Sequence, residues 1–183
     1  MLVIHPKDRT TAMLSALYEG TTGARLLDHS ATGKEIDRAI YHTPISERIM
    51  LLGHGSDKGL FWRNDDTQPC FDGILVGHRH AFHLRRHGAN LVAVFCYANM
   101  FATSNGLHGL FSGMIVTEME EAVEYGITTS KEELERENVK LFRRLRLFLD
   151  KGALLSDIPK LILDMDDVHT PLTEFNYKSF YYL

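Results

Sequence analysis

Two residues with reactive side chains, His54 and Cys96, each end an apolar run of the sequence. The run before His54 reads RIMLLG, and the run before Cys96 reads NLVAVF. Short apolar runs bounded by glycine or polar residues predict buried strands. In an open parallel sheet, ligands gather beyond the carboxyl ends of the strands. If these two strands are parallel neighbours, an imidazole and a thiol emerge together at that edge.

A thiol beside an imidazole is suited to nucleophilic catalysis. The thiolate is a strong nucleophile, and a nearby histidine is the usual means of forming it near neutral pH. Gly55 has no side chain, so its backbone N–H can approach a substrate carbonyl closely and, with the N–H of Cys96, hold an oxyanion. Taken alone, His54 also fits a hydrogen-bonded histidine at a strand end, and Cys96 fits a small buried apolar residue.

Predicted strands and helices that would position this pair alternate along the chain. Thr32 and Glu35 form a capping box at the start of one helix, Pro44 ends it, and Ser130 with Glu133 caps the longest helix. We expect strands over residues 1–6, 24–30, 48–55, 90–96 and 109–118, helices over 8–20, 32–43, 78–88, 130–152 and 155–163, a hairpin after His54, and an aromatic strand within 175–183. This alternation indicates a mostly parallel sheet with helices on both faces. Residues 1–183 contain no repeat or linker, so we expect a single α/β domain.

The order of these features resembles the caspase-like cysteine peptidases, a superfamily with caspases, metacaspases, gingipains, separase and bacterial CHAT domains. IMLLGHG followed by LVAVFC is similar to their paired motif, in which one hydrophobic block ends in His-Gly and the next ends in the catalytic cysteine. The resemblance covers nearly the whole chain, and the tail DVHTPLTEFNYKSFYYL looks like the last strand of CHAT-like domains. It implies a three-layer caspase-like domain in which His54 is the general base, Cys96 the nucleophile and Gly55 an oxyanion donor, with no cofactor.

The resemblance also implies which loops line the pocket for the residue before the cleaved bond. Glu118 follows the predicted fifth strand, and Lys7 and Asp8 follow the first. Glu118 or Asp8 would select a basic side chain, whereas Lys7 would select an acidic one. Val94 stands where relatives that cleave after basic residues often carry an acid, so the sequence leaves the specificity open.

Composition limits the classes of partner. The chain has 183 residues, 44% of them hydrophobic, and a formal net charge of −4. This balance gives no electrostatic reason to bind nucleic acid or an anionic membrane, and no apolar run approaches the roughly 20 residues that span a bilayer. With two cysteines and no signal-peptide pattern, we expect a cytoplasmic protein without a disulfide framework. Cys70 lies in the loop-like segment DTQPCFDG and is expected to be dispensable for chemistry.

A cluster of histidines invites a metal hypothesis, and its members are His78, His80, His83 and His87. The last three would share a helix face, and such pairs can chelate zinc. However, no carboxylate or cysteine completes the set at a familiar spacing, and the arginines at 79, 85 and 86 crowd it with positive charge. We therefore expect no metal and interpret the segment as a solvated basic face, which would also suit a phosphate or an acidic partner.

The leading hypothesis is a cysteine endopeptidase that cleaves a protein or peptide substrate through the His54–Cys96 dyad. Many relatives are latent until they are cleaved or bound by a partner, so an activating protein partner belongs to this hypothesis. One alternative is a catalytically inactive caspase-like module for interaction or regulation. Another is a doubly wound α/β protein that binds a small ligand at the sheet edge.

Overall fold

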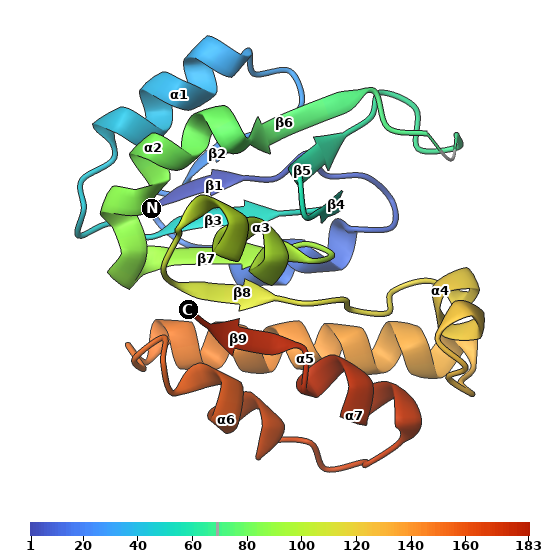
Figure 1. The fold of residues 1–183 in the computed structure, drawn as a ribbon. Helices are drawn as coiled ribbons and strands as arrows, with labels where there is room; N and C mark the ends of the chain where they lie inside the picture. The colour runs from blue at the N-terminus through green and yellow to red at the C-terminus, as the bar shows by residue number, and fades with distance from the viewer. Residues whose placement is uncertain (69) are drawn as a thin grey trace.

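A mostly parallel β-sheet runs through the centre of the molecule (Figure 1). The computed structural model describes residues 1–68 and 70–183. The strands lie in the order β2-β1-β3-β7-β8-β9, and β9 runs antiparallel to its neighbour β8. Their bounds are Leu2–Ile4 (β1), Arg25–Leu27 (β2), Ile49–Leu52 (β3), Leu91–Val94 (β7), Leu110–Ser112 (β8) and Phe180–Tyr182 (β9). The expected mostly parallel sheet is therefore confirmed.

The strands that precede His54 and Cys96 are direct neighbours. β3 and β7 pair in parallel, with Leu52 opposite Val94 at the end of the ladder. The pairing continues one step further, because the Gly53 N–H donates to the Val94 carbonyl at 3.1 Å. Both segments therefore leave the sheet at the same edge. His54 and Cys96 each lie two residues after the last paired residue of their strand.

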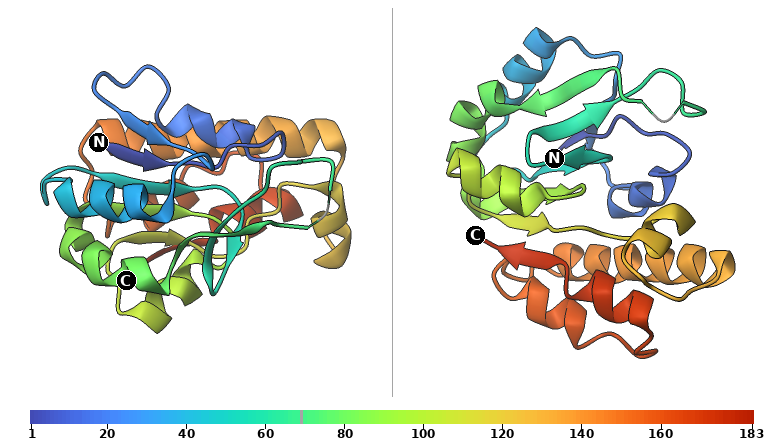
Figure 2. Two further views of the ribbon diagram at one scale, coloured as in Figure 1. Left: turned by 90° about the horizontal axis from the view of Figure 1, so that it is seen from above. Right: turned by 45° about the vertical axis from the view of Figure 1, so that its right-hand side comes forward.

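Helices cover both faces of the sheet, because alternate residues of each strand point to opposite sides. On β3, Leu51 packs into one apolar cluster with helices α1, α2 and α3, whereas Met50 packs into a second cluster with η1, α5, α6 and α7. Figure 2 shows α1 and α5 on opposite sides of the sheet. The bounds are Ala12–Leu17 (η1), Gly33–His42 (α1), Ala81–Leu84 (α2), Ala98–Asn105 (α3), Lys131–Asp150 (α5), Ile158–Leu163 (α6) and Pro171–Tyr177 (α7).

A small antiparallel sheet begins directly after His54. Its strands are β4 (Gly55–Ser56), β5 (Gly59–Trp62) and β6 (Gly73–Gly77), and β5 pairs with both others. The expected hairpin after His54 is confirmed, and its return strand leads to Arg63. After β8, the short helix α4 (Met119–Glu124) packs through Ala122 into a third, smaller apolar cluster beside α5 and α7.

The helix caps read from the sequence are present. Thr32 and Glu35 form the capping box of α1, in which the Thr32 hydroxyl accepts from the Glu35 N–H and the Glu35 carboxylate accepts from the Thr32 N–H. Ser130 accepts from the Glu133 N–H at the start of α5. These interactions are local in sequence, so the pattern of residue types was enough to place both helix starts.

Several predicted elements differ from the structure. Residues 8–20 contain a short 3₁₀ helix in place of an α-helix, because the Asp8 side chain captures the N–H groups of Thr10 and Thr11 and starts a turn. The predicted helix over 78–88 is a short α-helix, α2, flanked by 3₁₀ turns at His78–His80 (η2) and Arg85–Asn90 (η3), and His87 has non-helical backbone angles. The predicted fifth strand ends at Ser112, and residues 113–118 belong to no strand, although the Gly113 N–H still donates to the Ser179 carbonyl.

Three helices, α3, α4 and α7, were absent from the sequence prediction. α3 follows Cys96 directly, and its residues Ala98–Asn105 include Asn, Thr and Ser, which are weak helix formers. α7 ends inside the segment expected to be an aromatic strand, covering residues 175–177, so only Phe180–Tyr182 pairs with β8 as β9. Thr170 and Pro171 are a helix-start signal that could have revealed α7. Along the described residues, no helix combines the length and apolar character needed to cross a bilayer.

Candidate active site

His54 and Cys96 line the same small cavity at the carboxyl edge of the main sheet. The cavity has a volume of about 20 Å³, and its walls also include Thr10, Met13 and Thr117. A space of this size holds about one water molecule and no peptide side chain. The structure thus brings the two predicted catalytic residues to a common site, and that site is narrow, although both residues are partly exposed.

The His54 ring is held through its Nε2 atom. Nε2 lies 2.7 Å from the Thr10 hydroxyl oxygen and 3.1 Å from Oδ2 of Asp8. The Thr10 hydroxyl lies 3.0 Å from Oδ1 of Asp8 and has a single proton to donate, which the carboxylate takes. Thr10 therefore accepts from Nε2, and the proton of the neutral ring is on Nε2. In the described parts of the chain, Nδ1 makes no hydrogen bond, so Nδ1 is the nitrogen left as a base.

Asp8 is the centre of this network and is nearly buried, with a side-chain exposure of 6%. Its Oδ1 accepts from the backbone N–H and the hydroxyl of Thr10 and of Thr11, and its Oδ2 faces His54 and Arg63. Burial alone would raise the pKa of Asp8. The hydrogen bond with His54, the positive charge that His54 can carry, and the hydrogen bonds from Thr11 outweigh burial. Together they hold the pKa of Asp8 well below its usual range.

Arg63 supplies the positive charge that balances Asp8. Its Nη2 and Nε lie 2.6 and 2.8 Å from Oδ2 of Asp8, and its side chain is 10% exposed. The guanidinium also donates to the Gln68 carbonyl and lies 5.2 Å from the centre of the Phe71 ring. Sequence reasoning missed both Thr10 and Arg63. The only local signal for Arg63 was a cation placed directly after the return strand of the hairpin.

Cys96 lies at a sharp turn between β7 and α3. Tyr97, the next residue, has a φ of 62°, a left-handed conformation that a bulky side chain rarely adopts. Ser112 fixes the residue before Cys96, because its buried hydroxyl accepts from the Phe95 N–H at 3.0 Å and donates to the Phe95 carbonyl at 2.7 Å. Strained backbone of this kind persists where the surrounding structure holds it, and it concentrates at functional sites.

The surroundings of the Cys96 thiol favour its neutral form. Burial raises the pKa of Cys96 to about 12, and the nearby Glu121 carboxylate adds to this shift, while the Ile115 N–H opposes it. Glu121 is held in place by the N–H groups of Thr117 and Glu118 at 2.7 and 3.1 Å. Among the described residues, no hydrogen bond joins His54 to Cys96. The resting thiol is therefore protonated.

Gly55 and Cys96 are the two predicted oxyanion donors; Cys96 lines the cavity and Gly55 does not. The Phe61 N–H donates to the His54 carbonyl, so Gly55 and Leu60 form a non-hydrogen-bonded pair and the Gly55 N–H points away from β5. The Cys96 N–H has no acceptor in the described structure. The need for glycine at 55 comes from packing, since an added Cβ would lie 2.4 Å from the Phe95 ring and 2.5 Å from the Gly59 carbonyl oxygen.

A larger groove adjoins the small cavity. Its volume is about 510 Å³, and it shares Thr10, Met13 and Thr117 with the cavity. Its remaining lining residues are Arg9, Glu118, Met119, Glu120, Lys131, Leu134 and Glu135. Glu118 thus lies where the sequence analysis placed it, beside the candidate site. Lys7 is exposed and does not line the groove.

The remaining sequence candidates lie outside this site. The solvated-face interpretation of the histidine cluster is wrong for His80 and His87, which are fully buried; the His80 Nδ1 accepts from the Gly77 N–H at 3.0 Å. Within residues 1–68 and 70–183, no group of His, Cys, Asp and Glu side chains is arranged to hold a metal ion. Cys70 is exposed, and both cysteines are free thiols.

Comparison with known proteins adds no assignment: no family model matches the chain, and no significant match was found among curated proteins or solved structures.

Proposed function

We propose that the protein is a caspase-like cysteine endopeptidase in which Cys96 is the nucleophile and His54 the general base. The observation that carries this proposal is the shared cavity, which is lined by a histidine held by Asp8 and Thr10 and by a cysteine at a strained turn. Asp8 serves as a positioning residue for His54. This role replaces the substrate-binding role expected from the sequence, because both carboxylate oxygens of Asp8 are already engaged.

The geometry supports an acyl-transfer mechanism. As the Cys96 sulfur bonds to the carbonyl carbon, the thiol proton passes to Nδ1 of His54, and the N–H groups of Gly55 and Cys96 stabilise the oxyanion. The C–N bond then breaks and His54 returns the proton to the leaving amine. Water attacks the resulting thioester, gives a proton to His54, and the thiol is restored as the acid leaves. No cofactor enters these steps.

The narrowness of the cavity and the protonated thiol support a latent resting state. Entry of a peptide requires the walls at Thr10, Met13 and Thr117 to part, which would join the cavity to the larger groove. Displacement of the Glu121 carboxylate from the thiol would lower the pKa of Cys96 at the same time. Binding of a substrate or an activating protein partner would supply the free energy for this change.

For the residue before the cleaved bond, the groove favours a basic side chain. Glu118, Glu120 and Glu135 line the groove and outnumber the cations Arg9 and Lys131. Lys131 lies 3.9 Å from Glu135 and is partly neutralised by it. Glu118 is the carboxylate next to Thr117, a residue that the groove and the cavity share, so Glu118 is the candidate specificity residue.

A second function, an inactive regulatory module, is favoured by the same narrow site and the raised pKa of Cys96. A small-ligand binder has less support, because the cavity at the sheet edge has room for about one water molecule.

A peptidyl ketone probe that alkylates active-site thiols tests the proposal. We expect labelling at Cys96 that is abolished by Cys96→Ala and strongly reduced by His54→Ala, with Cys70→Ser as the matched control that keeps full labelling. Cleavage of a basic peptide library should follow the same order. Equal labelling of the wild type and His54→Ala would contradict the dyad, and a folded protein that is never labelled would favour the inactive module.

A further inference from the structure

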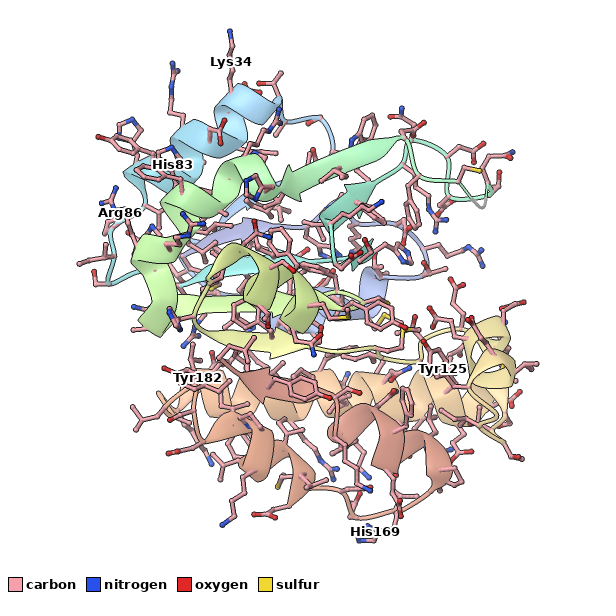
Figure 3. The ribbon with its side chains drawn as sticks, in the orientation of Figure 1. Lys34, His83, Arg86, Tyr125, His169 and Tyr182 are labelled. Atoms are coloured by element: carbon pink, nitrogen blue, oxygen red, sulfur yellow. The ribbon has the colours of Figure 1, made fainter. Side chains whose placement is uncertain are left out.

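A second surface feature lies far from the candidate active site, at the corner formed by α1 and α2. Figure 3 shows Lys34, His83 and Arg86 there, across the molecule from Tyr125, whose hydroxyl meets that of Tyr97 next to Cys96. The corner contains a hollow of about 370 Å³, lined by Lys34, Asp37, Arg38, Tyr41, His42 and His83. We call these residues, together with Phe82 and Arg86, the α1/α2 corner.

The corner carries positive charge that the chain itself does not neutralise. Within the described residues, Lys34, Arg38 and Arg86 take part in no salt bridge. The Glu35 carboxylate is occupied, since it accepts from the N–H and hydroxyl of Thr32. Asp37 lines the hollow as well, and the three cations outnumber it. On a chain with a net charge of −4, a group of unpaired cations is complementary to an acidic partner.

The corner also exposes apolar surface between these cations. Phe82 is 70% exposed and Tyr41 is 52% exposed. The Tyr41 ring is already ordered, because the Arg86 guanidinium lies 5.6 Å from its centre and the His83 ring contacts it edge-on at 5.4 Å. Exposed aromatic side chains with a charged rim are typical of protein–protein interfaces, where one aromatic anchor contributes much of the affinity.

We infer that the α1/α2 corner binds an acidic segment of a partner protein, with carboxylates on Lys34, Arg38 and Arg86 and an apolar side chain against Phe82. A protein segment fits better than a nucleic acid, because Arg86 lies over the Tyr41 ring and hinders base stacking there. This inference does not rest on the proposed peptidase activity, because the corner lies away from Cys96.

Binding to the full chain can be measured with three synthetic probes. The first is a short peptide of glutamates interrupted by leucine and phenylalanine, the second is the same peptide with glutamine in place of glutamate, and the third is a thymidine oligonucleotide of matched charge. We expect saturable binding of the acidic peptide alone, with amide chemical-shift changes confined to α1 and α2. Absence of saturable peptide binding, or tighter binding of the oligonucleotide, would overturn the inference.

Charge-reversal variants decide whether the corner itself is responsible. The double variant Lys34→Glu/Arg38→Glu should lower the affinity for the acidic peptide by at least about tenfold. Phe82→Ser should lower the same affinity about tenfold. Lys151→Glu/Lys160→Glu is the matched control, because it reverses two exposed cations away from the corner and should leave affinity within about twofold. Thermal melts confirm folding of each variant. Equal loss in the corner and control variants would show diffuse attraction and refute a specific site.

Discussion

Oδ2 of Asp8 lies 3.1 Å from Nε2 of His54, and the two residues come from loops after different strands of the sheet. Thr10 bridges them and fixes the ring proton on Nε2, which leaves Nδ1 as the base. An orienting acid behind a histidine is the arrangement that makes general-base catalysis efficient, because the imidazolium formed during the reaction gains a nearby negative charge. Asp8 therefore links the fold of the N-terminal loop to the chemistry expected at Cys96.

Asp8→Asn should lower kcat of the proposed peptidase by about 100-fold, with little change in KM. The amide keeps an oxygen for the Thr10 and Thr11 N–H groups but no longer stabilises the charged ring. Steady-state kinetics over a pH series would measure the effect, and thermal melts would report folding. If Asp8 instead selects the substrate, KM and side-chain preference will change and kcat will stay near the wild-type value.

Acid should destabilise the protein through Asp8. A carboxyl whose pKa is depressed in the folded state adds stability that is complete above its unfolded pKa of about 3.9 and is lost as the pH falls below that value. The wild type should therefore lose unfolding free energy between about pH 5 and pH 2. Asp8→Asn should show a smaller loss over this range in urea unfolding. Parallel pH curves for the two proteins would show that Asp8 is not the group responsible.

The Cys96 thiol should react slowly with iodoacetamide in the resting protein. Because its pKa is raised to about 12, the rate should keep rising through pH 9 and above, where an ordinary thiol of pKa about 8.5 would already approach a plateau. Glu121→Gln removes a neighbouring negative charge and should speed alkylation at pH 8. The measurement belongs in a Cys70→Ser background, so that Cys96 is the thiol observed. A plateau near pH 8.5 would contradict the assigned environment.

Ser112→Ala should destabilise the turn that presents Cys96. It leaves the buried N–H and carbonyl of Phe95 without the hydroxyl that now bonds both, which costs about 1–3 kcal/mol of unfolding free energy. Because Phe95 precedes the nucleophile, probe labelling of Cys96 should also fall. Unchanged stability with unchanged labelling would show that Ser112 does not hold this turn.

Ser130→Ala is the stability control for these variants. Loss of the cap on α5 should lower the unfolding free energy by about 1 kcal/mol, because the Glu133 N–H loses its acceptor. Labelling of Cys96 should not change, since Ser130 lies outside the cavity. A loss of labelling in this variant would mean that general destabilisation, and not local geometry, explains the effects at the site.

The sequence by itself determined the parts of the protein that depend on local patterns. Apolar runs located β3 and β7, capping residues located the starts of α1 and α5, and the alternation of elements indicated that the sheet is mostly parallel. From these, the approach of His54 and Cys96 to one edge could be inferred before the structure. α7 had a comparable signal at Thr170 and Pro171, but the aromatic residues that follow favoured a strand in the prediction.

Tertiary structure alone decided how the site is supported and how much room it has. Asp8 was a candidate from the sequence, yet its role depends on His54 and on Arg63, which lies 55 residues away. Ser112 and Glu121 had no motif to mark them, although they hold the Phe95 turn and raise the pKa of Cys96. Local sequence patterns report backbone preference and burial, whereas hydrogen bonds, cavity size and pKa depend on which distant side chains packing brings within a few ångströms.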